Sequence, residues 1–370
     1  MNIKSTLSYL GALSLLSISA LAPAADSEPK YVTYLTSWGV SEPETINLTK
    51  ADVMLLAFGK WDSSGNIVTS DAIADIPKYD AYWLPPSYQA WTQWKLSNPQ
   101  KHVMIAFGGQ TYEAIWDLIQ TPEQREIVAK NLVALSAQSF PVYKKGLTQQ
   151  ELAGECLNTN SDGSCNFANY QLAGYVKIDG FDFDFEKSSR ISAEESSNLL
   201  ALTQRIRELT APETMLSLTT YHVGADPVAC SSNTVFDGCS YTEEGRSEHN
   251  GEVTDLLKQS ANLFNFFDVM AYDAGKNFNY CVALNNYAAA VGDKSKIVLG
   301  LTNNKQWSPE GSFVQSQAEN IKRTEWEARN GFGGVFLWAM GSNSESLTMS
   351  EQVNGFNEVI ESDQQQRSTM

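Results

Sequence analysis

The chain has 370 residues, of which 43 are Asp or Glu and 26 are Lys or Arg, so its formal net charge is −17 at pH 7. This acidic balance argues against nucleic acid and anionic membranes as partners, because both attract basic surfaces, and it favours a neutral or cationic ligand. Aromatic residues make up 11% of the chain; such rings often stack on sugars, although most aromatic residues in any protein pack in its core.

The N-terminal residues 1–24 have the features of a signal peptide. An apolar stretch follows Lys4 and runs from Leu7 to Leu21, and the small residues of Ala22-Pro23-Ala24 come next. We therefore expect cleavage near Ala25 and export, either to the periplasm or out of the cell. A membrane anchor is the alternative, and the short, Ser-interrupted apolar run disfavours it.

Short β-rich apolar runs alternate with helical stretches along the rest of the chain. The expected strands are 31–37, 53–59, 102–107, 180–185, 215–221, 267–272, 296–301 and 334–338. The expected helices include 124–138, 193–209, 252–263, 314–330 and 350–360. This alternation, without a change in composition, predicts an α/β fold with a single (β/α)₈ TIM barrel over residues 30–360. The polar tail, 361–370, is expected to be disordered.

The fourth expected strand carries a ladder of carboxylates. Because side chains alternate along a strand, Asp182, Asp184 and Glu186 share one face. Phe181, Phe183 and Phe185 share the other face. Successive carboxylates lie roughly 7 Å apart, so ionising all three is costly and at least one pKa should rise, as a general acid requires.

A solvated edge strand or a Ca²⁺ site is the alternative explanation for these carboxylates. The three Phe residues on the opposite face argue against a solvated strand, so we favour a catalytic site. Asp179 is out of phase with the other three acids. We interpret it as a structural hydrogen-bonding residue at the beginning of the strand.

In a barrel of this type, functional residues lie at the carboxyl ends of the strands, where Glu186 is expected. The same ends carry further aromatic and acidic residues, which we expect to converge on one mouth: Trp38, Phe58, Tyr221, Tyr272, Asp273 and Trp338. Core packing is the alternative for each ring. In the long segment after the second strand, Tyr88, Trp91 and Trp94 have helical spacing, so a packed helix face is favoured over a sugar-binding wall.

The five cysteines of an exported protein suggest disulfides. Local spacing pairs Cys156 with Cys165 and Cys230 with Cys239, which leaves Cys281 unpaired. Each bridge would fix the geometry of one loop; the alternative is that some of these thiols stay reduced and buried. The spacings match no Cys-x-x-Cys zinc site, and we expect neither a metal nor a cofactor.

Three motifs resemble family 18 of the glycoside hydrolases, the chitinase family. Residues 179–186 fill that family's Asp-x-x-Asp-x-Asp-x-Glu pattern, residues 270–273 resemble its Met-x-Tyr-Asp, and residues 333–338 resemble its eighth strand. The resemblance covers the whole barrel. One departure is Ala106, because the family's third strand has a Ser there; that hydroxyl would support the carboxylate cluster from below. Another is Gln110, where many members have an aromatic residue.

The resemblance implies substrate-assisted hydrolysis of N-acetylglucosamine linkages. By this resemblance Glu186 is the acid, Asp184 orients the substrate's acetamido group, and Asp182 shares a proton with Asp184. Tyr272 positions the acetamido carbonyl. The substrate-binding residues are expected to be Trp338, Asp273, Met270, Tyr221, Phe58 and Trp38.

The expected substrate is chitin or another N-acetylglucosamine oligosaccharide, cut internally by a monomeric, secreted enzyme. An endo-β-N-acetylglucosaminidase that acts on N-glycans would share the motif and the chemistry. A chitinase-like lectin is a further alternative, which the presence of Glu186 disfavours.

Overall fold

The computed structural model describes residues 28–69, 73–77, 84–148, 150, 154–156, 159–165, 170–232, 236–241, 248–275, 277–306, 313–342 and 347–370. The predicted signal peptide lies outside these residues. Within them, no helix is long and apolar enough to cross a membrane.

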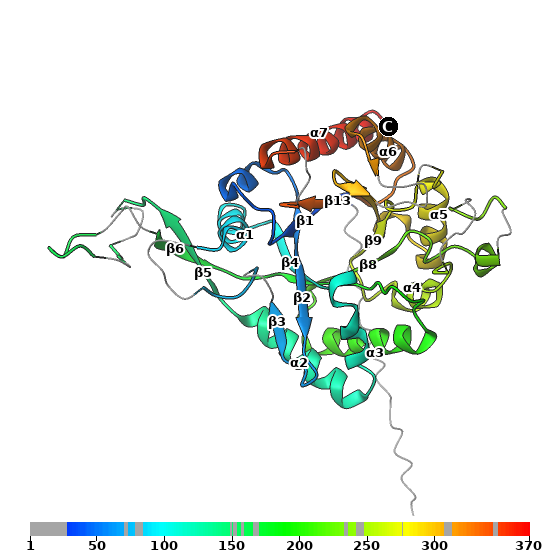
Figure 1. The fold of residues 1–370 in the computed structure, drawn as a ribbon, viewed down its shortest axis with the longest axis horizontal. Coiled ribbons are helices and arrows are strands. Elements are labelled where there is room, and N and C mark those ends of the chain that lie inside the picture. Colours follow the sequence, from blue (N-terminus) through cyan, green and yellow to red (C-terminus); the bar gives the residue numbers. More distant parts are fainter. Residues whose placement is uncertain are drawn as a thin grey trace, which may run out of the picture.

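Eight parallel strands form a closed barrel that helices surround (Figure 1). The barrel strands are β1 (Lys30–Thr36), β2 (Val53–Trp61), β4 (His102–Gly108), β7 (Gly180–Asp184), β8 (Met215–Tyr221), β9 (Phe266–Met270), β10 (Ile297–Thr302) and β13 (Gly334–Met340). Strand β1 pairs with both β13 and β2, which closes the sheet. The predicted (β/α)₈ barrel is thus confirmed, and every strand lies within two residues of its expected limits.

The surrounding helices are α1 (Pro86–Ser97), α2 (Pro122–Ala137), α3 (Ala193–Leu209), α4 (Thr254–Ser260), α5 (Tyr280–Val291), α6 (Gln317–Arg329) and α7 (Met349–Ser368). Short 3₁₀ segments are η1 (Pro43–Leu48), η2 (Gln110–Leu118), η3 (Val228–Ser232) and η4 (Lys294–Lys296). Helices α2, α3 and α7 begin with capping boxes, in which a Thr or Ser and a Gln or Glu satisfy each other's backbone N–H groups. In α1, the rings of Tyr88, Trp91 and Trp94 are fully buried, which confirms the predicted packed helix face.

Three small antiparallel additions lie outside the barrel alternation. Strand β3 (Ile67–Thr69) pairs with β2, and β11 (Lys305–Gln306) pairs with β12 (Phe313–Val314). Strands β5 (Phe140–Lys145) and β6 (Tyr170–Val176) form a hairpin that projects away from the barrel (Figure 1). Both predicted disulfides are present: Cys156–Cys165 joins residues between β5 and β6, and Cys230–Cys239 lies in the loop after β8.

The C-terminal tail differs from the prediction. Helix α7 continues to Ser368 instead of ending in a disordered tail. Asp363 is fully buried and accepts a hydrogen bond from Tyr31 Oη at 2.7 Å, and Arg367 pairs with both Asp363 and Glu327 at 2.7 Å. Polar composition suggested disorder, but these polar groups have buried partners in β1 and α6.

Candidate active site

Side chains from opposite sides of the barrel meet in its interior. The Tyr34 hydroxyl on β1 donates a hydrogen bond to Asp182 on β7 at 3.0 Å. Because β1 and β7 are not neighbours in the sheet, this bond crosses the barrel. An inner apolar cluster that includes Val32, Met104 and Val298 surrounds the same space. The carboxyl groups inside therefore lie in a poorly solvated environment.

Strand β7 shows the predicted alternation. Asp182 and Asp184 are buried within the barrel, with exposed fractions of 0% and 3%. The three Phe side chains between and beyond them are fully buried in the outer core. Phe183 packs against Phe264, and Phe185 packs edge-on against Trp116. The strand thus has one polar face toward the barrel axis and one aromatic face toward the helices.

Asp179 has the predicted structural role. Its carboxylate accepts a hydrogen bond from Val103 N at 2.7 Å and pairs with Lys95 at 2.8 Å. Burial would raise the pKa of Asp179, but the nearby His102 ring and the hydrogen bonds from Lys95 and Val103 hold it below the ordinary value. This carboxylate connects the beginning of β7 to β4 and α1.

Three hydroxyl groups surround the Asp182 carboxylate. Ser217 Oγ donates to Oδ1 at 2.7 Å, Tyr34 Oη contacts Oδ2 at 3.0 Å, and Thr219 Oγ1 lies 3.1 and 3.2 Å from the two oxygens. Burial raises the pKa of Asp182 to about 6, although these hydroxyls oppose the increase. Hydroxyls from β1 and β8 thus support a carboxylate that no hydroxyl of β4 reaches, because β4 has Ala106 beside it.

Two further acids lie near Asp182 with fewer partners. Asp184 Oδ1 and Asp268 Oδ1 are buried and have no hydrogen-bond partner in the part of the chain that the structure describes. Burial, followed by repulsion from Glu186 and Asp182, raises the pKa of Asp184 well above its ordinary value. Burial and repulsion from Asp182 do the same for Asp268 on β9. The interior therefore favours neutral carboxyl groups at both positions.

Glu186 lies just beyond the end of β7, where the barrel fold predicts the catalytic acid. Its Oε1 atom accepts a hydrogen bond from Gln110 N at 2.8 Å. Burial raises the pKa of Glu186, and hydrogen bonds from Tyr221 and Gln110 partly oppose this shift. A carboxyl group with a raised pKa at the mouth of the barrel has the properties of a general acid.

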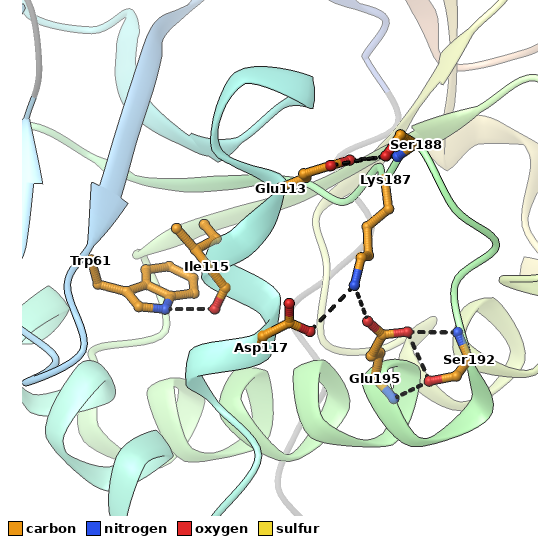
Figure 2. A network of polar contacts seen from close by, with 8 residues as sticks. All are labelled: Trp61, Glu113, Ile115, Asp117, Lys187, Ser188, Ser192 and Glu195. Atoms are coloured by element: carbon orange, nitrogen blue, oxygen red, sulfur yellow. Dashed lines mark hydrogen bonds and ion pairs between the residues drawn. The ribbon is translucent and has the colours of Figure 1, made fainter.

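A network of polar contacts holds the backbone next to Glu186 (Figure 2). Lys187 Nζ lies between Asp117 of η2, at 3.3 Å, and Glu195 of α3, at 2.5 Å. The other carboxylate oxygen of Glu195 completes the capping box with Ser192. This connection fixes the loop after β7 against the first turn of α3.

The segment η2 is held at both of its sides (Figure 2). Glu113 accepts hydrogen bonds from the backbone N–H and the hydroxyl of Ser188. On the other side, Trp61 Nε1 of β2 donates to Ile115 O at 3.0 Å. Because η2 also provides the Gln110 N–H, these contacts fix the direction of the Glu186 carboxyl group.

Aromatic rings from three strand ends gather around Trp338. The Phe58 ring stacks on Trp338 with centroids 5.6 Å apart and planes 23° apart, and Tyr34 meets it edge-on at 5.2 Å. Trp38 lies 6.4 Å away and is 49% exposed. The predicted rings of β1, β2 and β13 are thus brought together, with Trp38 at the solvent side.

The residues after β9 complete the mouth. Tyr272 is buried against Phe336, with ring centroids 5.9 Å apart, and Met270 belongs to the same inner cluster. Burial and the nearby Asp184 and Asp273 raise the pKa of Tyr272, so its hydroxyl stays protonated. Asp273 is exposed and has a positive φ of 56°. Tyr221 is partly buried, with its hydroxyl toward Lys187 O and Glu186.

Four residues of this cluster were absent from the predicted site: Tyr34, Ser217, Thr219 and Asp268. Ser217 and Thr219 have the two-residue spacing of one strand face, and Asp268 is a lone acid in an apolar strand. Both are signals of an inward polar face. Among the described residues, no group of three or more His, Cys, Asp or Glu is arranged to hold a metal ion.

A cavity of about 570 Å³ lies at the opposite end of the barrel, at the amino ends of β1, β2 and β4. Its lining includes Lys30, Asp52 and Lys101 and none of the clustered acids. We therefore locate the candidate active site at the carboxyl ends of the strands, where the acid ladder and the aromatic rings meet.

The family model that matches this barrel describes a class of enzymes that cleave glycosidic bonds. The chain belongs to glycosyl hydrolases family 18, whose family model matches residues 30–322. No curated protein matches the sequence.

Several solved structures share the fold. The group IV chitinase of Ostrinia furnacalis, solved in complex with allosamidin, is 13% identical with a TM-score of 0.59, and the match covers 91% of this chain and 100% of that one. A family 18 chitinase from Pseudoalteromonas aurantia is 16% identical with a TM-score of 0.57, covering 89% and 99%. A family 18 N-acetylglucosaminidase from Paenibacillus barengoltzii is 12% identical with a TM-score of 0.56, covering 90% and 100%.

Proposed function

We propose that the protein is a secreted chitinase that cuts β-1,4 linkages between N-acetylglucosamine residues within a chain. The observation that carries this proposal is the ladder of Asp182, Asp184 and Glu186, which ends at the mouth with an acid of raised pKa. Family membership adds the reaction class, and chitinases among the solved neighbours make this substrate class the first to test.

In the first step of the proposed mechanism, Glu186 donates its proton to the glycosidic oxygen as the bond to C1 breaks. The substrate's own 2-acetamido oxygen attacks C1 and forms an oxazolinium ion, so the enzyme needs no carboxylate nucleophile. Asp184 accepts a hydrogen bond from the acetamido N–H and stabilises the developing positive charge. The negative charge that this requires comes from the coupled pair of Asp182 and Asp184.

In the second step, the Glu186 carboxylate takes a proton from water, which attacks C1 from the side that the leaving sugar occupied. The ring reopens and the anomeric configuration is retained. The protonated Tyr272 hydroxyl is suited to donate a hydrogen bond to the acetamido carbonyl oxygen. Trp338, backed by Phe58, provides an apolar floor for the pyranose ring.

Three further expectations belong to this proposal. The described residues between β10 and β13 form only the short β11–β12 pair and α6, so we propose an open groove that accepts internal linkages. The predicted leader and the two disulfides support export to an oxidising compartment. We also propose that the enzyme acts as a monomer.

The proposal is tested with chromogenic chito-oligosaccharides and their de-N-acetylated counterparts. Because the nucleophile is the acetamido group, hydrolysis of only the acetylated series is expected. Equal hydrolysis of both series would contradict the mechanism. Release of glycans from a high-mannose glycoprotein, without cleavage of chito-oligosaccharides, would instead favour an endo-β-N-acetylglucosaminidase, and sugar binding without any cleavage would favour a lectin.

A further inference from the structure

The buried acid Asp268 has no role in the mechanism above. Its side chain is fully buried on β9. Among the described residues its Oδ1 atom has no hydrogen-bond partner, and its Oδ2 atom contacts only the Thr219 hydroxyl, at 3.5 Å. A buried carboxylate without donors is costly, whereas a buried carboxylic acid has a hydrogen to donate.

The Thr219 hydroxyl connects Asp268 to Asp182. Thr219 Oγ1 lies 3.1 Å from the nearer Asp182 oxygen and 3.5 Å from Asp268. It has one hydrogen, and the shorter distance favours donation to Asp182. The Asp268 oxygen can then satisfy this contact only as the donor to Thr219 Oγ1.

The acceptor of the Tyr34 hydrogen depends on whether Asp268 donates to Thr219. Its hydroxyl contacts both Thr219, at 2.8 Å, and Asp182, at 3.0 Å, and it can donate to only one of them. When Asp268 donates to Thr219, the Thr219 oxygen is a weaker acceptor for a second hydrogen than the ionised Asp182 carboxylate is, so the Tyr34 hydrogen is directed to Asp182. Together with Ser217, three hydroxyl hydrogens then point at Asp182, which is the arrangement that an ionised carboxylate needs.

We propose that Asp268 is a positioning residue that stays protonated and, through Thr219, holds Asp182 in its ionised form. This inference rests on the proposed function wherever it concerns activity. Asp268 does not contact the substrate; it acts on Asp184 and the acetamido group only through Asp182.

The titratable groups around Asp268 are consistent with this assignment. Asp182 and Asp184 face it from β7, Tyr34 faces it from β1, and Tyr272 follows it on its own segment. The adjacent strand β10 has no titratable residue, and the titratable residue of β8 is Tyr221, whose hydroxyl is directed to Lys187 O and Glu186. His222, beyond β8, packs against Tyr241 and Phe278 instead. No described cation therefore neutralises Asp268, and repulsion from the other acids favours its neutral form.

Two variants of similar size show whether Asp268 acts as a hydrogen-bond donor or only fills space in the core. Asp268→Asn keeps a hydrogen donor, whereas Asp268→Leu removes it. With Leu, Tyr34 turns toward Thr219, Asp182 loses a donor, and its pKa rises. The acidic limb of the kcat/KM profile should therefore move up by about one pH unit in Asp268→Leu and keep its wild-type position in Asp268→Asn.

The opposite assignment gives a different result. If Asp268 were ionised, both variants would remove a negative charge, and both acidic limbs would move to lower pH; this outcome would overturn the proposal. A purely structural role would lower the yield of folded enzyme without moving either limb, and it would also overturn the proposal.

Infrared spectroscopy in D₂O decides the protonation state without any activity assay. At neutral pD, the wild type should show a protonated-carboxyl C=O band that Asp268→Asn lacks. Identical bands in the two proteins would overturn the proposal. The infrared comparison remains valid even when Asp268→Leu does not fold. It also remains valid when the protein hydrolyses no chito-oligosaccharide and the proposed function fails.

Discussion

At the scale of single residues, Asp182 and Glu186 must be in opposite protonation states during catalysis. The acid cluster needs a negative charge, and burial raises the pKa of Asp182 to about 6; activity should therefore be lost as the pH falls through about 6. Glu186 must be protonated, and its pKa is raised. The pH at which activity is lost on the alkaline side should therefore be higher than the ordinary pKa of a Glu side chain.

We expect a bell-shaped profile of kcat/KM against pH, whose limbs belong to the coupled cluster. Initial rates on a chromogenic chitobiose across pH 4 to 10 measure it, with a stability control at each pH. An acidic limb near pH 4, the ordinary value for Asp, would contradict the account of a buried and perturbed cluster.

The sequence predicted which residues of the ladder share a face, because alternation along a strand is local. It did not predict the hydroxyls around Asp182, because Tyr34 reaches it across the barrel and Ser217 and Thr219 reach it from the next strand. Such contacts depend on the register between strands far apart in the chain, and a hydroxyl in a strand does not indicate its partner.

At the scale of elements, η2 and the loop after β7 hold the acid in position. Lys187→Met removes the connection from that loop to Asp117 and Glu195, so we expect kcat to fall about tenfold, with KM nearly unchanged, because the acid is misaligned and binding is not. Lys322→Met is the matched control, since Lys322 forms an exposed pair on α6. An equal loss in both variants would count against a positioning role.

The two disulfides provide a second comparison of elements, because each joins cysteines nine residues apart. The Cys230–Cys239 bridge lies in a loop at the carboxyl end of the barrel, whereas Cys156–Cys165 lies in the projecting hairpin between α2 and β7. Replacing the first pair by Ser should lower kcat/KM about tenfold through the loop that follows Tyr221, and replacing the second should not. Steady-state kinetics of both double variants, with Ellman titration of thiols, measure this. A larger loss of kcat/KM in the Cys156/Cys165 variant than in the Cys230/Cys239 variant would refute the prediction.

At the C-terminus, composition gave the wrong prediction. The polar residues 361–370 predicted disorder, yet α7 extends through them. Their partners, Tyr31 and Glu327, are more than thirty residues away in the sequence, so no local pattern indicates them. The eight strands, by contrast, were predictable because buried parallel strands are short apolar runs.

At the scale of the whole molecule, one ion cluster connects the first strand to the last two helices. Arg367 of α7 pairs with the fully buried Glu327 of α6 and with Asp363, which also binds Tyr31 of β1. Burial and the adjacent Asp363 raise the pKa of Glu327 to about 8, although Arg367 opposes the increase. This cluster joins α6 and α7 to β1, the strand that closes the barrel by pairing with β13.

Arg367→Met should therefore lower the free energy of unfolding by about 3–5 kcal/mol, because it leaves the buried Asp363 carboxylate without its cation. Arg329→Met, which removes an exposed pair with Glu325, should change it by less than about 1 kcal/mol. Urea denaturation followed by Trp fluorescence measures both variants. Equal changes in the free energy of unfolding for the two variants would show that the cluster does not stabilise the barrel.

The most direct test of the central claim compares the wild type with Glu186→Gln on a chromogenic chitotriose. The substitution keeps the shape of the side chain and removes the acidic proton. We predict turnover by the wild type and a loss of roughly 10²-fold to 10⁴-fold in the variant, with unchanged thermal stability. Equal turnover by both proteins, or no turnover by either, would contradict the assignment of Glu186 as the acid of a chitinase.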